Sequence, residues 1–461
     1  MINSMNLKLK YLLIISLSAI FSSGFSQDNK EPLKLSLAEA QSYALENSRA
    51  VKTARIDLAS ADKKIWETIA MGLPQLGLSA NYQHQFVVPE LSFGNFLDPY
   101  ALPDGFITNT DILNAYKPSP SVPLGVPDNT TFDFTLSQLI FSGEYIVGLQ
   151  ATKVYKEISV NSLAKTEAQT RETIAGTYSL YLVLSENQRV LNESLVSVEQ
   201  TYNEVLKLNE QGFNEETDVD QIKINMSNLK RLITSVEAQK DVTIKLLKYQ
   251  LGMELEQPLI LTDSLSPIIK EGNIQYLSPP SFNVESSIDY KIVRNLESSS
   301  AIFLKRERSM YLPTINSFYR RHEQTNSPSF NFQVKDLVGV GLNIPIFTSG
   351  LRSSRVSQAK FDLEKAKINT ENAAQGLILE FETALTTYQT AFSNFVTNSE
   401  SIILSKKIYD KTLIKYQEGV SSSFELSQNQ SQYLVAETAY YSSVLNLLMA
   451  KAKLDRILTV N

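Results

Sequence analysis

The sequence predicts a mostly α-helical protein with a smaller β-strand portion, built from two internal repeats. Two stretches, Tyr202–Leu251 and Tyr409–Leu458, carry the same pattern at an offset of 409 − 202 = 207 residues. Each contains a glycine ten residues after its first tyrosine, Gly212 in one and Gly419 in the other. Elsewhere, matching points of both halves show the strict two-residue alternation of polar and apolar residues that is typical of strands. Together these observations indicate a duplicated unit of helices and strands.

The repeated stretches are expected to be helical hairpins that turn at the glycines. Glycine adopts the positive φ angles that end a helix and reverse the chain. An acid follows each glycine by six residues, Asp218 and Glu425. Apolar spacing of three and four residues after it predicts a helix that pairs side by side with its neighbour. The heptad positions of the first copy are Ile222, Met226, Leu229, Ile233, Val236 and Leu247, and those of the second are Asn429, Tyr433, Ala436, Tyr440, Ser443 and Leu454.

The N-terminus has the three parts of a secretory signal. Lys8 and Lys10 precede an apolar run, and small and polar residues follow up to Ser26. We therefore expect residues 1–26 to be a signal peptide. No later stretch reaches the length of apolar sequence that a membrane-spanning helix needs, so any crossing of a membrane is expected to be by strands.

The first repeat is expected over residues 27–251. Ser36 and Glu39 form a capping-box pattern at the start of a helix that runs to Met71. Strands are predicted at about 75–87 and 131–142. A long loop, 87–130, joins them and contains seven of the chain's sixteen prolines.

The predicted strands have two different faces. In the first strand apolar side chains alternate with small or polar ones, so one face suits lipid or a core and the other suits water. The apolar set is Leu76, Leu78, Ala80, Tyr82 and Phe86, and the polar set is Gly77, Ser79, Asn81, Gln83 and Gln85.

A very long helix is expected to follow each pair of strands. There is no proline between Glu144 and Gln257, and Gly143 and Gly212 are 69 residues apart, as are Gly350 and Gly419. At 1.5 Å per residue such a helix is roughly 100 Å long. The narrow apolar seams predict coiled-coil pairing with a shorter return helix, which in the first repeat runs from Thr217 to Gly252.

The second repeat is expected over residues 284–461, after a linker or equatorial segment at 252–283. The linker holds four prolines and no helical period, with room for short strands. The second repeat carries strands at about 314–323 and 334–348. Leu73 and Leu312, which both precede the first strand of their repeat, are 239 residues apart, because the first repeat holds 239 − 207 = 32 additional loop residues.

Composition argues against several functions. The net charge is −6, which does not favour a nucleic-acid partner, and the absence of cysteine excludes thiol chemistry. The two histidines, His84 and His322, lie at matching strand ends without a catalytic or metal-ligand pattern. Gly339 and Gly341 lack the third glycine and the helix start of a dinucleotide site. We therefore expect no enzymatic activity, no cofactor and no metal.

The order of these elements carries a resemblance that covers nearly the whole mature chain. Helix, Leu-Pro, strand, loop, strand, Ser-Gly, long helix, glycine tip and heptad helix occur twice behind a signal peptide. This order resembles that of the TolC-like outer-membrane efflux proteins. Leu73-Pro74 and Leu312-Pro313 are the Leu-Pro pairs, and Ser142-Gly143 and Ser349-Gly350 are the Ser-Gly pairs. The sequence departs from some members in having no lipid-anchoring cysteine and in ending directly after the last heptad helix.

The resemblance implies a homotrimer in the cell outer membrane that extends into the periplasm. Its strands would form a shared twelve-stranded β-barrel, continued by an α-helical coiled-coil barrel. The implied function is the exit duct of a tripartite efflux pump, which passively conducts substrates. The implied partners are a periplasmic adaptor protein, an inner-membrane pump and outer-membrane lipid, and the cargo class stays open between drugs, metals and polypeptides.

The resemblance also suggests roles for the tips. Acids at this distance from the tip glycine line a periplasmic aperture in the family, and the matching positions are Asp218 and Glu425. The same acids suit a helix N-terminus, where they cap the helix and favour its dipole. The candidate aperture residues are Asp218, Glu425, Gln428, Glu215 and Glu216. The candidate adaptor-docking residues are Gly212, Phe213, Gly419, Val420 and Ser421.

A second function class remains open at this point. Heptads alone would also suit an elongated secreted or periplasmic coiled-coil scaffold or adaptor protein. The repeated two-faced strands favour the duct, because four strands from one chain cannot close a barrel and their open edges would be costly in lipid.

Overall fold

The computed structural model describes residues 32–91, 121–274, 281–328 and 331–459. The expected signal peptide, residues 1–26, lies outside the described residues, as does 92–120 of the expected long loop. The chain forms two compact units, and each takes segments from both halves of the sequence. Among the described parts, unit 1 holds residues 32–52, 166–274, 281 and 381–459, and unit 2 holds 53–91, 121–165, 282–328 and 331–380.

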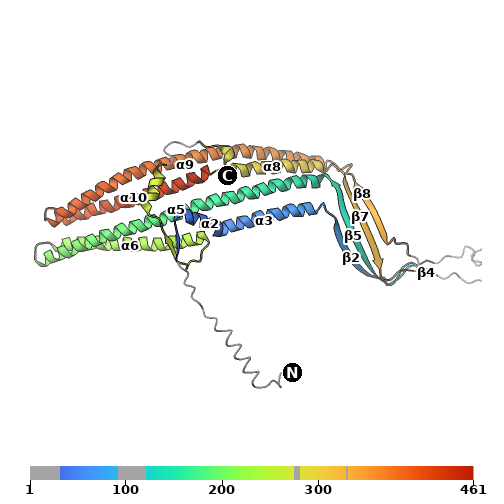
Figure 1. Ribbon diagram of the computed structural model, residues 1–461, viewed down its shortest axis with the longest axis horizontal. Coiled ribbons are helices and arrows are strands. Elements are labelled where there is room, and N and C mark those ends of the chain that lie inside the picture. Colours follow the sequence, from blue (N-terminus) through green and yellow to red (C-terminus); the bar gives the residue numbers. More distant parts are fainter. Residues whose placement is uncertain (1–31, 92–120, 275–280, 329–330, 460–461) are drawn as a thin grey trace, which may run out of the picture. The chain divides into compact units, whose positions relative to one another are not determined.

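Unit 2 contains a four-stranded antiparallel sheet in the order β2-β5-β7-β8 (Figure 1). The strands are β2 (Gln75–His84), β5 (Asp128–Ser142), β7 (Thr314–Gln324) and β8 (Asp336–Asn343). The pair β3 (Glu90–Leu91) and β4 (Val122–Pro123) adds a second, two-stranded sheet. Each of the four expected ranges holds a strand, but β8 ends at Asn343 instead of about 348. Pro345, which has no N–H to donate to a ladder, follows two residues later.

The apolar residues of neighbouring strands face each other across the ladder. Leu76 is paired with Leu136, and Leu78 with Phe134. Leu76 nevertheless keeps 76% of its surface exposed, and Val338 on the outer strand β8 keeps 74%. The sheet is therefore a ribbon with an apolar surface that no other described part of this chain covers. Its outer strands, β2 and β8, each leave one edge without a partner in the four-stranded order.

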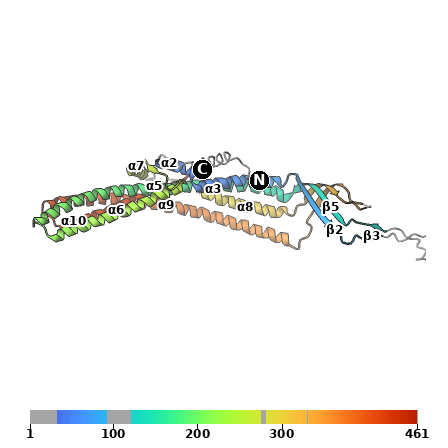
Figure 2. The same cartoon turned by 90° about the horizontal axis from the view of Figure 1, so that it is seen from below.

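Four helical segments complete unit 2 (Figures 1 and 2). They are parts of α3 (Arg49–Ala70), α5 (Gly143–Glu210) and α9 (Leu351–Gln417), together with α8 (Ile288–Ser309). Ion pairs join α5 to its two neighbours. Lys156 contacts Asp62 of α3 at 2.9 Å, and Lys165 contacts Asp289 of α8 at 2.6 Å. The Lys156–Asp62 pair is exposed and the Lys165–Asp289 pair is half-buried, so the first contributes little to stability.

Unit 1 is a helical bundle with one short pair of strands beside it. Its helices are α2 (Leu37–Asn47), α6 (Glu216–Leu251), α7 (Leu265–Ile274), α10 (Ser423–Leu458) and the C-terminal parts of α5 and α9. Strands β1 (Leu33–Leu35) and β6 (Leu259–Leu261) pair in parallel. Among the described residues, no helix of either unit combines the length and apolarity needed to cross a membrane.

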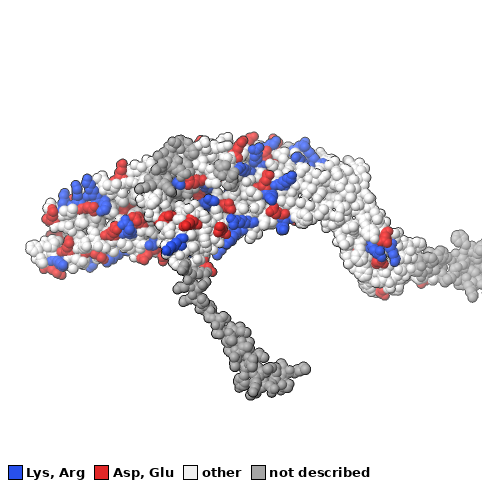
Figure 3. Space-filling view, in the orientation of Figure 1, with Lys and Arg blue, Asp and Glu red and all other residues white. Residues whose placement is uncertain are grey.

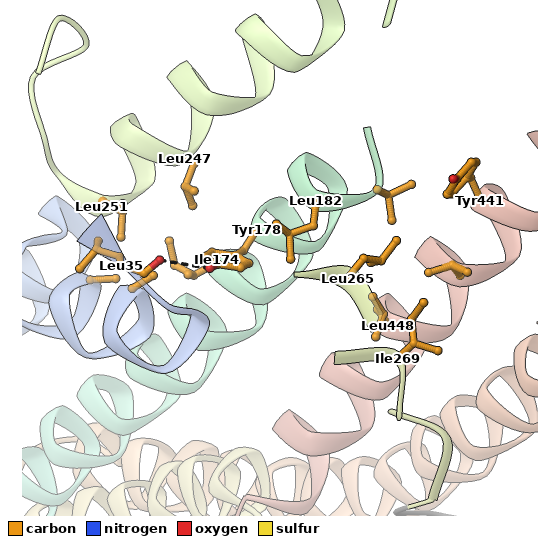
Figure 4. Packing of buried hydrophobic residues seen from close by; sticks show 14 of the residues in the cluster. Leu35, Ile174, Tyr178, Leu182, Leu247, Leu251, Leu265, Ile269, Tyr441 and Leu448 are labelled. Atoms are coloured by element: carbon orange, nitrogen blue, oxygen red, sulfur yellow. Dashed lines mark hydrogen bonds between the residues drawn. The ribbon is translucent and has the colours of Figure 1, made fainter. Parts of the chain in front are cut away.

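The largest core cluster of unit 1 gathers side chains from most of these elements (Figure 4). Tyr178 of α5 is fully buried, and its hydroxyl lies 3.1 Å from the Leu35 carbonyl oxygen and 3.0 Å from the Asp263 carboxylate. The same carboxylate accepts the backbone N–H of Leu37 at 2.7 Å. Burial raises the pKa of the Tyr178 hydroxyl, so this group stays a neutral donor. It fixes the start of α2 against α5.

The opening helix differs from the expected single span of Ser36–Met71. The capping box is present, with the Ser36 N–H donating to Glu39 at 2.8 Å and the Glu39 N–H donating to Ser36 Oγ at 3.4 Å. The helix is interrupted at Ser48, which has an extended backbone with ψ 141°. Ser48 is buried, and its hydroxyl oxygen accepts the Val51 N–H at 3.3 Å, so it restarts the chain as α3. Serine competes with the helix ladder in this way.

The segment 252–283 also differs from the expected helix-free linker. It contains α7, and Leu265 and Ile269 of this helix are buried in the main core cluster with Leu448 of α10 (Figure 4). Pro267 stands in the first turn of α7, where its missing N–H is not needed. A ten-residue helix with a proline in its first turn gives too short a periodic pattern to be recognised from sequence alone.

The buried stripe of α10 follows the expected heptad only in part. Asn429 and Ala436, which match the buried Ile222 and Leu229 of α6, are only half-buried. Gln430 and Glu437, one residue later, are buried instead. The expected positions Tyr433, Ser443 and Leu454 are buried as predicted. A shift of one residue turns a helix face by about 100°. α10 thus buries two residues beside the expected seam in addition to part of the seam itself.

Candidate functional site: the two hairpin tips

Both hairpins turn through the same backbone motif. Gly212 has φ +80° and Gly419 has φ +75°, the left-handed conformation that favours glycine. The Phe213 N–H donates to the Leu208 carbonyl at 2.9 Å. The equivalent Val420 N–H donates to Lys415 at 2.8 Å. These are Schellman turns, so the chain reverses identically at both tips.

The return helices begin differently at the two tips. Ser422 caps α10, and its hydroxyl oxygen accepts the Glu425 N–H at 3.2 Å. The Glu425 carboxylate in turn accepts the Ser421 hydroxyl at 2.6 Å. At the other tip Glu215 occupies the cap position of α6 without a side-chain bond to the helix backbone, and it accepts the Thr217 hydroxyl at 3.2 Å. The Glu425 carboxylate is therefore held within its own tip by Ser421, while Ser422 supplies the cap.

Asp218 joins the two hairpins. Its carboxylate accepts a hydrogen bond from the hydroxyl of Ser423, which is only 8% exposed. Further along the same interface Gln221 Nε2 donates to Ser427 Oγ at 3.0 Å, and Ser427 Oγ donates to Asn225 Oδ1 at 3.1 Å. These contacts hold α6 and α10 together directly behind the tips. Figure 1 shows the two hairpin ends lying side by side.

A tyrosine group lies just inside the tips. Burial raises the pKa of Tyr416 to about 12, and the negative charge of Asp218 adds to this effect. Tyr409 of α9 stacks on Tyr433 of α10 with ring centroids 5.8 Å apart. Both rings are buried, so they pack the second hairpin together.

Apolar side chains project from the tips. Phe213 is 76% exposed and Val420 is 74% exposed. Phe424, in the first turn of α10, is 71% exposed and extends this surface. In the sequence, only the position of Phe424 next to the candidate residue Glu425 indicated that it belongs to the tip. Ser421 is half-buried and bonded to Glu425.

The candidate aperture acids are not gathered by hydrogen bonds within one chain. Asp218 is bonded to the opposite hairpin, whereas Glu425 is bonded within its own tip. Glu215, Glu216 and Gln428 are exposed. Sequence reasoning missed the Gln221, Asn225 and Ser427 contacts, because short polar residues on a helix give no periodic signal.

The histidines lie elsewhere, on the sheet of unit 2. His84 Nδ1 is 2.8 Å from Asp128, and His322 Nδ1 is 2.8 Å from Asp133. No group of three or more His, Asp or Glu side chains in the described ranges could hold a metal ion. Nearby, Arg321 bonds Glu323 at 2.7 Å, and Figure 3 shows charges gathered at this end of the sheet and an uncharged visible surface on the rest of it.

Known proteins share this fold. Residues 305–459 match the model of the outer membrane efflux protein family. The outer membrane protein VceC of Vibrio cholerae is 14% identical, with 92% of this chain and 96% of that chain covered at a TM-score of 0.68. The Campylobacter jejuni CmeC outer membrane channel is 17% identical, with 91% and 85% covered at a TM-score of 0.71. The open-state MtrE outer membrane channel of Neisseria gonorrhoeae is 15% identical, with 92% and 88% covered at a TM-score of 0.67.

These three channel structures share their fold with this chain over nearly its whole length. The match to the outer membrane efflux protein family lies in the C-terminal part of the chain. The resemblance to TolC-like outer-membrane efflux proteins that the sequence predicted is therefore confirmed. This family consists of channels and not of enzymes. A comparison with curated proteins finds no match.

Proposed function

We propose that this protein is the outer-membrane exit duct of a tripartite efflux pump, through which substrates pass without energy input from the duct itself. Three copies would form it in the cell outer membrane, with the helices extending into the periplasm. The sequence repeats, residues 27–251 and 284–461, would be its two equivalent halves.

The observation that carries this proposal is the four-stranded sheet. It has an exposed apolar surface, including Leu76 and Val338, and two outer strands without partners. Unpaired backbone groups cost several kcal/mol each in hydrocarbon, so a sheet of this kind is viable in a membrane only when its edges are closed. Three copies of four strands remove every edge by forming a closed barrel of twelve.

The hairpin tips support the partners of the proposal. Exposed aromatic and aliphatic side chains at the end of a helical hairpin suit a protein partner rather than water. Phe213, Val420 and Phe424 form such a surface. We assign it to a periplasmic adaptor protein, which would connect the duct to an inner-membrane pump.

The proposal is tested by fractionation of the natural protein. The mature chain is expected to begin near Gln27, to separate with the outer membrane and to require detergent as a trimer. N-terminal sequencing, membrane separation and mass measurement in detergent check the three points. Recovery of the protein as a soluble periplasmic monomer would instead support the coiled-coil scaffold.

A further inference from the structure

A buried carboxyl group without a partner lies in the helical core of unit 1. Glu437 of α10 is 1% exposed. Neither of its carboxyl oxygens has a hydrogen-bond partner among the described residues. A buried charge without a counter-charge or hydrogen bonds is strongly unfavourable, and such a group takes up a proton instead.

The immediate neighbours of Glu437 are aromatic. Tyr433 and Tyr441 lie one turn away on either side of it along α10, and both are buried. The negative charge of Glu437 contributes to the raised pKa of each tyrosine, after burial itself. Tyr409 of α9 closes the same region by stacking on Tyr433. Glu437 is therefore flanked along α10 by two buried tyrosines, and neither of its carboxyl oxygens accepts a hydrogen bond from their hydroxyls.

The charged groups on the neighbouring helices do not compensate this carboxyl. The lysine of α9 nearest to the tyrosines, Lys406, is engaged by Asp410 at 3.0 Å. On α6, Arg231 is exposed in a groove that also includes Thr438 of α10. On α5, Arg189 pairs with Glu186 and Glu193, and Lys240 of α6 bonds Gln188 of α5.

Burial raises the pKa of the Glu437 carboxyl to about 7. The raised pKa makes the stability of the folded protein depend on pH. Between the ordinary pKa of a glutamate and about 7, the folded protein holds a proton that the unfolded chain has lost. Stability therefore falls as the pH rises through this window and levels off above it.

We propose that Glu437 is a proton-controlled lock in the helical bundle behind the tips. In its protonated form the side chain packs as a neutral group and α10 stays against α5 and α9. In its ionised form the carboxylate draws in water and loosens α10. The Asp218–Ser423 contact lies 437 − 423 = 14 residues nearer the tip, about 21 Å along the helix, so loosening of α10 would reach the joined hairpins.

The proposal concerns the packing of the helices and can be tested without any transport assay. Its consequence for conduction, a duct whose periplasmic end loosens as the pH rises, rests on the proposed function. A protein that shows the lock but not the membrane location would refute only the proposed function.

The test compares the full-length protein with Glu437→Gln, which keeps the shape of the side chain but cannot ionise. Glu400→Gln, an exposed glutamate on α9, is the matched control. Backbone hydrogen exchange is measured in detergent by mass spectrometry. After correction for the intrinsic rate, exchange in α10 of the natural protein is expected to accelerate about tenfold between about pH 6 and about pH 8. Glu400→Gln should behave identically, and Glu437→Gln should lose this acceleration.

An unchanged pH profile in Glu437→Gln would overturn the proposal. If this variant does not fold, the natural protein itself supplies the measurement. A glutamate carboxyl, followed by carbon-13 NMR of labelled glutamate, should titrate near neutral pH. Absence of any glutamate that titrates near neutral pH would equally refute the lock.

Discussion

Single glycines decide where this chain can turn, and their surroundings differ. Gly252, which ends α6, has φ +78°. A Cβ at this position would lie 2.3 Å from the Asn47 carbonyl oxygen. Gly212 has φ +80°, but a Cβ there would have nothing within 4 Å. The two positions share a backbone conformation and differ in the space around it.

This difference predicts unequal effects of the same substitution. Gly212→Ala carries only the strain of a left-handed alanine, about 1 kcal/mol. Gly252→Ala adds a clash with backbone at the break between α2 and α3, and should destabilise the protein by about 3 kcal/mol or more. Unfolding of both variants in denaturant, followed by circular dichroism, measures the difference. Equal losses of stability would show that the close approach to Asn47 is not maintained.

Residue spacing predicted the turns but not the buried carboxyl. The offset of 207 residues correctly equated Gly212 with Gly419, because a left-handed turn depends only on local backbone. The same offset correctly predicted buried positions such as Tyr433 and Leu454 in α10. It also placed Asn429 and Ala436 in the seam, where the adjacent Gln430 and Glu437 are buried instead. Rotation of a helix about its axis is set by its neighbours in the bundle, which a local pattern does not contain.

At the level of elements, the hairpin tip is a small apolar surface on a rigid support. Phe213 and Val420 are exposed. Each directly follows the glycine of a Schellman turn, and its own backbone N–H donates the hydrogen bond that closes the turn. Their side chains make no contribution to the core clusters of the described residues. Substitution of these side chains should therefore leave the fold intact.

We predict that Phe213→Glu combined with Val420→Glu abolishes export while the yield of trimer stays normal. The added charges would have to be desolvated on docking of the adaptor, which costs several kcal/mol. Efflux of a dye from cells and cross-linking to the adaptor measure the effect. A matched control is Phe213→Leu with Val420→Ile, which keeps the surface apolar and should export normally. Normal export by the charged variant would remove these residues from the docking surface.

Long elements could be predicted from the sequence, and short ones could not. The long helices α5 and α9 and the four strands of the main sheet follow from sustained periodicity and from the punctuation by proline and glycine. The break at Ser48 and the helix α7 depend on tertiary contacts, since Ser48 and Leu265 are buried among residues distant in sequence. A serine inside a helical pattern gives no signal for such a break.

At the level of the whole molecule, repeats and compact units divide the chain differently. The repeats follow one another in sequence, whereas each unit combines segments from both of them. Unit 1 thus brings the two equivalent tips together, and the Asp218–Ser423 contact joins them. A duplicated hairpin therefore gives one composite tip per chain, and threefold assembly would multiply that composite tip around an axis.

The last prediction concerns the charge of this assembled end. In a trimer Asp218 and Glu425 would each occur three times, and carboxylates that face a common lumen repel anions and attract cations. Single-channel recordings in a planar bilayer should show cation selectivity, and multivalent cations added from the periplasmic side should reduce the current. Asp218→Asn with Glu425→Gln should weaken both effects.

The structure explains why this double variant should still fold. In Asp218→Asn the amide oxygen could accept the Ser423 hydroxyl as the carboxylate does, and the Ser422 cap of α10 does not involve the side chain of Glu425. Glu400→Gln, at an exposed site on α9 far along the helix from the tip, is the control for a general change of charge. Because Glu425 also accepts the Ser421 hydroxyl, a purely capping role predicts lower helix stability with unchanged selectivity. Persistent selectivity and block in the double variant would thus assign both acids to the caps and place the constriction elsewhere.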